Sequence, residues 1–125
     1  MSFGRRLLLF DGLAGLISGL AVLSLSGFLS RFYQIPWTFF IFHGGISLSY
    51  ATYSLTLANQ RVRPPWRVNL LIGANLTWAT LCLFFAYWFW SPDMFLGSIH
   101  LALEWLFVGG LGLYEWRNRD QLASS

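Results

Sequence analysis

Charge is scarce in this sequence of 125 residues: only 10% are Asp, Glu, Lys or Arg, and there is no lysine at all. Soluble domains carry about 25% charged residues. A soluble chain of this length could not hide a composition that is 56% hydrophobic and 19% aromatic. Disorder is excluded as well, because disordered chains are rich in charge and poor in aromatics. The absence of lysine excludes Schiff-base chemistry on this chain, including attachment of retinal.

Cysteine is nearly absent too, with Cys82 as the one example. No disulfide can form within the chain, which excludes a secreted disulfide scaffold. Because Cys82 lies in a long apolar run, we interpret it as a small core residue. Motifs for phosphate loops, nucleophilic serines and Cys-x-x-Cys metal sites are also missing. We therefore do not expect an enzyme, and we expect no metal site.

Long hydrophobic runs take the place of the missing charge. A transmembrane helix needs about 20 mostly apolar residues, and four stretches meet this requirement, at about 7–29, 36–58, 68–90 and 95–114. The linkers between them are so short that consecutive helices must lie antiparallel and adjacent. The sequence therefore predicts an all-α membrane protein. Residues 1–125 would form a single domain, an antiparallel up-down bundle of four transmembrane helices.

Arginine positions predict the orientation of this bundle, since cytoplasmic loops carry an excess of basic residues. In a four-span topology every arginine except Arg31 falls on one side. We expect the N- and C-termini to be cytoplasmic, in a bacterial inner membrane or a photosynthetic membrane. Scattered arginines in so apolar a chain indicate lipid partners and no nucleic acid. The residues expected to contact lipid are Arg5, Arg6, Arg61, Arg63, Arg67, Arg117, Trp37, Trp66 and Trp90.

Ionisable residues inside the predicted spans are functional candidates, because each costs roughly 2.5–3.5 kcal/mol in hydrocarbon and needs a partner. They are Asp11, His43, His100 and Glu104. His100 and Glu104 are four residues apart and share one helix face, which continues to Glu115. For Asp11 we expect an ion pair with Arg6, Arg63 or Arg117. The polar network predicted inside the membrane consists of Asp11, Ser47, Tyr50, Asn75 and Glu104.

Two interpretations of His43 and His100 stay open. In the first, each imidazole is an axial ligand of a tetrapyrrole, either haem or the magnesium of chlorophyll or bacteriochlorophyll. Gly44 and Gly45 would then let the flat macrocycle approach the backbone. In the second, the histidines hydrogen-bond to Glu104, Ser47 or a carbonyl and fix the helix register.

Glycines predict where helices pack closely, because small residues let helix backbones approach in a membrane. Gly12, Gly15 and Gly19 share one face of the first predicted helix. We therefore expect that face to be a helix–helix contact.

Several short motifs along the chain form a further pattern: Asp11-Gly12, Tyr33-Gln34-Ile35-Pro36, Arg63-Pro64-Pro65, Asn75-Leu76-Thr77-Trp78, Pro92, Leu96-Gly97 and Glu115-Trp116-Arg117. In these motifs the chain resembles a family of uncharacterised small bacterial membrane proteins with four predicted spans. The resemblance covers nearly the whole chain and implies the four-helix fold, without an activity. The chain departs from the family at Glu104, where the family has Gln. His43 and His100 lie outside the family pattern.

Two functions fit these observations. The first is a non-enzymatic accessory or structural subunit of a larger membrane complex, with other membrane-protein subunits as partners and His43 or His100 contributing to a tetrapyrrole site. The alternative is a small proton-coupled transporter that uses Glu104. Because one four-helix bundle offers little interior space, we expect such a transporter to be a dimer.

Overall fold

The computed structural model describes residues 2–123, so residues 1, 124 and 125 of the predicted domain lie outside the described part. Within residues 2–123 the chain is helical and contains no strand, as predicted. The four long helices are α1 (Phe3–Ser24), α3 (Trp37–Ala58), α4 (Pro65–Trp88) and α5 (Phe95–Arg117). The two short helices are α2 (Ser26–Tyr33) and α6 (Arg119–Ala123).

Three of the described helices, α1, α4 and α5, are long and apolar enough to cross a membrane. This agrees with the predicted multi-pass membrane class. Helix α3 has 22 residues, as many as α1, and carries no Asp, Glu, Lys or Arg. Its mean hydropathy is lower than that of the other three, because serine, threonine, tyrosine and histidine side chains interrupt its apolar run. That α3 also crosses a membrane stays a prediction.

The first predicted span, residues 7–29, is divided in the structure. Helix α1 ends at Ser24 and α2 begins at Ser26, with Leu25 between them outside the helical conformation. Serines flank the break, and serine side chains compete with helical backbone bonds. Helix α2 ends at Tyr33 and is followed by Gln34, whose φ of 58° lies in the left-handed region. The predicted linker from Ser30 onward is therefore partly helical.

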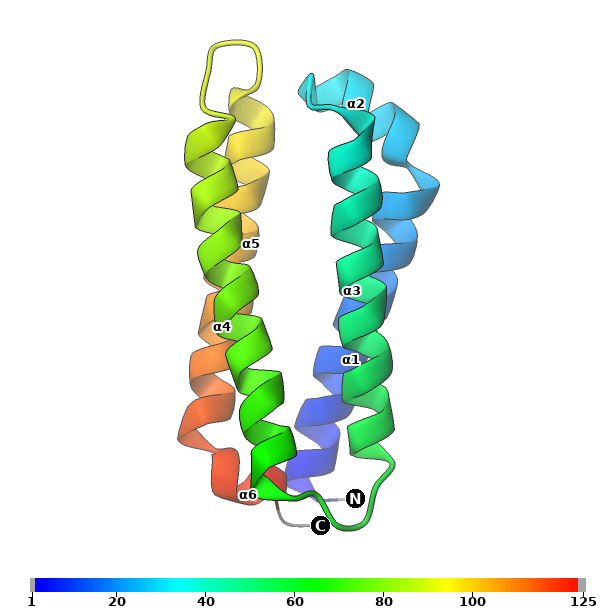
Figure 1. Ribbon diagram of the computed structural model, residues 1–125, viewed down its shortest axis with the longest axis vertical. Coiled ribbons are helices and arrows are strands. Elements are labelled where there is room, and N and C mark those ends of the chain that lie inside the picture. The colour runs from blue at the N-terminus through cyan, green and yellow to red at the C-terminus, as the bar shows by residue number, and fades with distance from the viewer. Residues whose placement is uncertain (1, 124–125) are drawn as a thin grey trace.

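The long helices form two antiparallel pairs, α1 with α3 and α4 with α5 (Figure 1). Glycines allow close approach in the first pair. A Cβ added at Gly15 would lie 3.4 Å from the Cβ of Ala51, and one added at Gly19 would lie 3.2 Å from the carbonyl oxygen of Gly44. The predicted glycine face of α1 thus packs against α3, as the need for small residues at membrane helix contacts requires.

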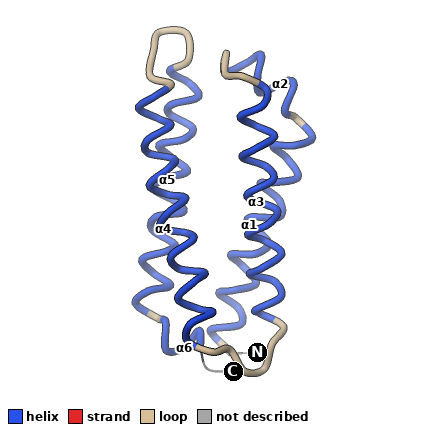
Figure 2. Tube along the Cα trace, in the orientation of Figure 1, coloured by secondary structure: helices blue, strands red, loops and turns tan. Residues whose placement is uncertain are grey.

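Helix α6 joins the two pairs at the end that holds both termini (Figure 2). Its Leu122 is fully buried and accepts a hydrogen bond on its carbonyl oxygen from Nε of Arg63. Nη1 of Arg63 donates to the Gln60 carbonyl at 3.0 Å. A Cβ at Gly4 would overlap the carbonyl oxygen of Gln121, so α1 meets α6 closely only through glycine.

Arg63 therefore differs from its predicted place among the lipid-contacting residues. Only 2% of its surface is exposed, and its guanidinium lies inside the joint between α6 and the α3–α4 loop. Burial, together with the charge of Arg5, lowers the pKa of Arg63. The guanidinium donates hydrogen bonds to the backbone carbonyls of Leu122 and Gln60 instead of to a lipid headgroup.

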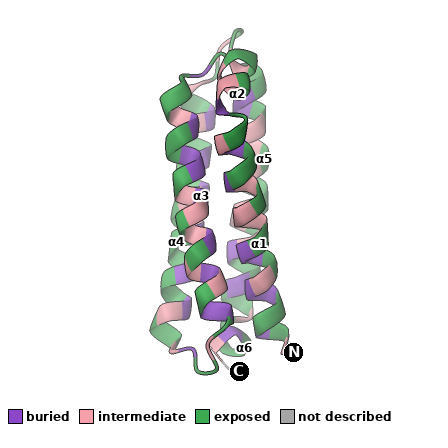
Figure 3. Ribbon diagram, turned by 90° about the vertical axis from the view of Figure 1, so that its right-hand side faces the viewer, coloured by how far each residue is buried: buried purple, intermediate pink, exposed green. Residues whose placement is uncertain are grey.

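Buried residues face the interior along all four long helices, while their outer faces are exposed (Figure 3). One apolar cluster lies next to α6 and includes Leu8, Leu57, Leu71 and Leu122. Two smaller clusters lie nearer the opposite end, around Phe40 and around Cys82, and Phe39 and Phe89 pack against both. The exposed outer faces are strongly apolar, which suits contact with lipid.

Candidate functional site: a cavity between the helix pairs

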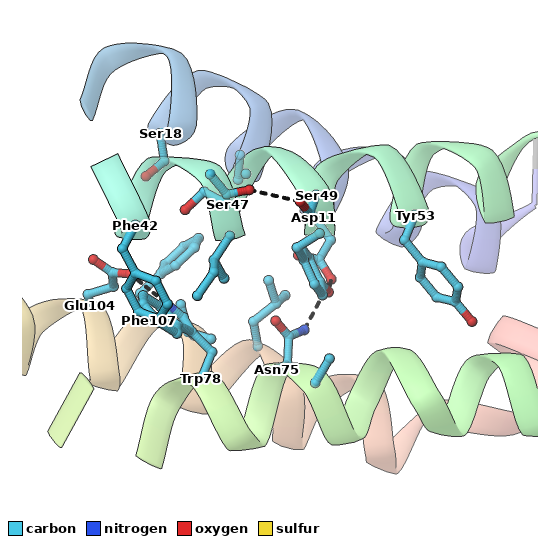
Figure 4. Close-up of a pocket in the computed structure, with 18 of the residues that line it drawn as sticks. Asp11, Ser18, Phe42, Ser47, Ser49, Tyr53, Asn75, Trp78, Glu104 and Phe107 are labelled. Atoms are coloured by element: carbon cyan, nitrogen blue, oxygen red, sulfur yellow. Dashed lines mark hydrogen bonds between the residues drawn. The ribbon is translucent and has the colours of Figure 1, made fainter. Parts of the chain in front are cut away.

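A cavity of about 1070 Å³ lies between the two helix pairs and is lined by α1, α3, α4 and α5 (Figure 4). Most of its wall is apolar or aromatic. Each of these four helices contributes polar or ionisable side chains to the wall: Asp11, Ser18, Ser47, Ser49, Tyr50, Tyr53, Asn75, His100 and Glu104. None of the described arginines lines it. An apolar pocket with a few convergent polar groups is the usual form of a small-molecule site.

Glu104 of α5 is the centre of one polar cluster in this cavity. Its Oε1 lies 2.7 Å from Nε2 of His43 on α3. Its Oε2 accepts a hydrogen bond of 2.7 Å from Nε1 of Trp78 on α4 and a weaker one of 3.6 Å from the thiol of Cys82. One carboxylate thus connects the two helix pairs. This geometry matches the second interpretation of His43, in which the imidazole hydrogen-bonds to Glu104.

His100 lies at the edge of the same cluster. Its Nε2 is 3.8 Å from Oε1 of Glu104, and its side chain is 42% exposed. Nδ1 of His100 is 3.1 Å from the hydroxyl of Tyr33 on α2. Burial raises the pKa of Tyr33, so this hydroxyl keeps its proton and can donate it to Nδ1. Nε2 of His100 then carries the ring proton and faces Glu104.

The second ring nitrogen of His43 is buried without a partner among the described residues. His43 as a whole is 2% exposed. If the ring is neutral, Nε2–H donates to Glu104 and Nδ1 presents a lone pair. If the ring is charged, Nδ1 becomes an unpaired buried N–H donor, which proteins avoid more strongly than an unpaired acceptor.

A second polar cluster surrounds Asp11, nearer the end with both termini. Oδ2 of Asp11 accepts hydrogen bonds from the Tyr50 hydroxyl and, at 3.2 Å, from Nδ2 of Asn75. The same Asn75 nitrogen also donates to Oε1 of Glu115, which is fully buried. Neutral donors hold Asp11, so the predicted pairing of Asp11 with an arginine is wrong.

Glu115 is the member of this cluster that the sequence analysis did not include in the polar network. The signal was present, because the face shared by His100 and Glu104 continues to Glu115. What sequence could not show is how far α5 is rotated toward Asn75 on the neighbouring helix. Of the predicted network, the structure brings Asp11, Tyr50 and Asn75 together. It places Glu104 in the other cluster and Ser47 in the cavity wall between helices.

The two glycines beside His43 lie in different surroundings. Gly44 faces α1, where an added Cβ would lie 3.3 Å from the carbonyl oxygen of Gly19. Gly45 lines the cavity, and a Cβ there would meet nothing within 4 Å. Only Gly45 therefore offers room for a ligand. The other predicted lipid-contacting residues, unlike Arg63, are exposed or half-buried: Arg5, Arg6, Arg61, Arg67, Arg117, Trp37, Trp66 and Trp90.

No protein-family model, curated protein or solved structure matches this chain. Across residues 2–123, no three His, Cys, Asp or Glu side chains come together in a way that could hold a metal ion. The function must therefore be argued from the cavity and its two polar clusters.

Proposed function

We propose that this chain is a non-enzymatic integral membrane protein that binds a small amphiphilic molecule in the cavity between its helix pairs. The observation that carries the proposal is the cavity itself, whose volume of about 1070 Å³ lies at the upper end of the usual range for ligand pockets. Its aromatic and apolar wall suits the body of such a molecule, and its two polar clusters suit a polar head.

In this proposal α3 is the fourth span and both termini are cytoplasmic. Length and lack of charged residues support α3 as a span. Its His43, Ser47 and Ser54 are buried against other helices. The exposed Ser49 and Thr52 donate hydrogen bonds to carbonyls of α3 itself, so their hydroxyl protons are satisfied without water. Both termini and the α3–α4 loop lie at one end of the molecule (Figure 1), and every arginine except Arg31 belongs to helix ends or loops there. The excess of positive charge at that end supports a cytoplasmic location for it.

The cavity favours the carrier alternative over a purely structural subunit. A transporter was expected to need two copies, because one bundle would offer little interior space. One copy already has a cavity with Glu104 and Asp11 in its wall. The space for a substrate therefore needs no second subunit.

A matched pair of glycine variants tests this function. Gly45 lines the cavity, whereas Gly73 is exposed on α4 and has equally open space around it. We expect Gly45→Phe to fill the cavity and Gly73→Phe to leave it open. Native mass spectrometry of the protein purified in mild detergent, with Nile red as a neutral hydrophobic probe, should show a bound probe in the parent and in Gly73→Phe only. Equal retention in all three proteins would contradict the proposal.

A tetrapyrrole-binding subunit is the second candidate, and His100 is the observation that favours it. Tyr33 holds Nδ1 of His100, and Nε2 lies at the cavity. Ligation requires the tautomer in which Nδ1–H donates to the Tyr33 hydroxyl and Nε2 presents its lone pair, which is the arrangement typical of metal-ligating histidines. Nε2 of His43 is already used for Glu104. An absorption spectrum of the protein from its native membrane decides this: we expect tetrapyrrole bands that disappear in His100→Leu, and a colourless sample rejects the candidate.

A further inference from the structure

We infer that the ligand is a lipophilic organic cation that binds beside Glu104 in exchange for one proton held by the Glu104–His43 pair. The inference rests on the proposed function and adds the charge of the ligand and its coupling to protons. Three observations carry it: the charges in the cavity wall, the aromatic rings beside Glu104, and the unpartnered nitrogen of His43.

The charged groups of the cavity wall are of one sign. Two carboxyl groups, Asp11 and Glu104, reach the cavity, while no described arginine does. An anion would meet these carboxylates in a low-dielectric space where repulsion is strong. A neutral ligand would make no charge-assisted contact with either carboxyl group. A cation is attracted by the same group.

Aromatic rings stand beside Glu104, at the end of the cavity where the charge of the ligand would lie. Figure 4 shows Phe42, Trp78 and Phe107 gathered next to Glu104. The ring centroids of Phe42 and Trp78 are 6.3 Å apart, from helices of different pairs. Aromatic faces attract organic cations, and the attraction increases when water is excluded. A carboxylate with several aromatic rings favours a quaternary or aromatic cation over a small hydrated metal ion.

The groups that face Glu104 can supply a proton but no permanent positive charge. They are His43 from α3, Trp78 and Cys82 from α4, His100 on α5 itself, and Tyr33 of α2 behind His100. Of the groups on α1, Asp11 belongs to the other cluster. In the empty cavity the Glu104–His43 pair is neutral overall only if it holds one dissociable proton, on either the carboxyl or the imidazole.

The hydrogen bond between His43 and Glu104 does not depend on that proton. Nδ1 of His43 has no partner among the described residues, and neutral His43 still donates Nε2–H to Glu104. When a cation binds, the proton is released to water, and the cation then balances the negative charge of the Glu104 carboxylate. One positive charge enters and one leaves, so the net charge of the cavity is unchanged.

A pair of ions with the same shape and opposite charge tests the sign of the ligand. Tetraphenylphosphonium is a lipophilic cation and tetraphenylborate is its anionic counterpart. Titration calorimetry of the detergent-solubilised full-length protein should show binding of the cation, and no binding of the anion at the cavity. We expect Glu104→Gln to weaken cation binding by about tenfold or more, because a charge-assisted contact is lost. Asp93→Asn removes the same charge from an exposed loop and should leave binding unchanged.

The proton is tested separately. Cation binding should tighten as the pH rises through the titration of the pair, by up to about tenfold per pH unit, because each bound cation displaces one proton. Calorimetry in two buffers of different ionisation enthalpy should report close to one proton released per cation. In Glu104→Gln the release should fall toward zero. Binding without proton release would overturn the exchange.

The outcomes separate this inference from the function on which it rests. Equal cavity binding of cation and anion, blocked by Gly45→Phe, overturns the charge preference and keeps the cavity as a binding site. Binding of neither ion, together with binding of Nile red, likewise overturns only the cation inference. If the folded parent protein binds no probe of any charge, both the inference and the proposed function are wrong.

Discussion

Glu104 and His43 lie 2.7 Å apart on helices of different pairs, with the carboxylate on α5 and the imidazole on α3. Phe39 of α3 also packs against Phe85 and Phe89, and the Tyr53 hydroxyl donates to the Arg67 carbonyl. The hydrogen bond between Glu104 and His43 is therefore one of several contacts that position the two halves of the cavity. We propose that the same two residues recognise the charge of the ligand and exchange the proton. Stability and binding should therefore depend on the same two residues.

The first prediction concerns this pair. Replacing either residue alone, by His43→Phe or Glu104→Leu, leaves a buried polar partner unsatisfied and should destabilise the protein by about 1–3 kcal/mol. The double replacement should cost less than the sum of the two. A double-mutant cycle on unfolding in mixed micelles measures this coupling. Strictly additive effects would show that the two side chains do not interact.

The second prediction concerns Asn75, whose amide nitrogen donates to both Asp11 and Glu115. Asn75→Ala removes the donor from two buried carboxyl groups and should lower the free energy of unfolding by about 1–3 kcal/mol. Thr77 on the same helix is exposed, so Thr77→Ala is the matched control and should change little. If both variants unfold alike, the Asp11 cluster does not stabilise the fold.

The third prediction concerns the contact between α1 and α6. A Cβ at Gly4 overlaps a backbone carbonyl, whereas a Cβ at Gly73 meets nothing within 4 Å. Gly4→Ala should push α6 away and increase hydrogen exchange around Leu122. Gly73→Ala should leave exchange there unchanged and stabilise α4 slightly, by about 0.5–1 kcal/mol, because glycine is a poor helix former. Unchanged protection of α6 in Gly4→Ala would argue against the close contact.

The fourth prediction concerns topology. In a Cys82→Ala background, we expect Asp93→Cys in the α4–α5 loop to react with a membrane-impermeant maleimide from outside intact cells. Gln60→Cys in the α3–α4 loop and Asn118→Cys after α5 should react only after the membrane is opened. Labelling of Gln60→Cys from outside would show that α3 does not cross the membrane in the proposed sense.

Composition and periodicity were enough to predict the class of this protein. Little charge and long apolar runs predicted helices of membrane-spanning length, and α1, α4 and α5 confirm this. The spacing of Gly12, Gly15 and Gly19 predicted a packing face, which α3 occupies. These features are local, because they depend only on which residues recur at helical spacing along one segment.

Features that involve two or more helices were not available from the sequence. Arg63 was expected at the lipid headgroups but bonds to the carbonyl of Leu122. Asp11 was expected beside an arginine, yet the rotation of α4 and α5 brings Asn75 to it and Glu115 to Asn75. The cavity exists because the two pairs pack tightly within themselves and meet each other at only a few points. Helix rotation and separation follow from how side chains of different segments fit together, which a linear pattern does not contain.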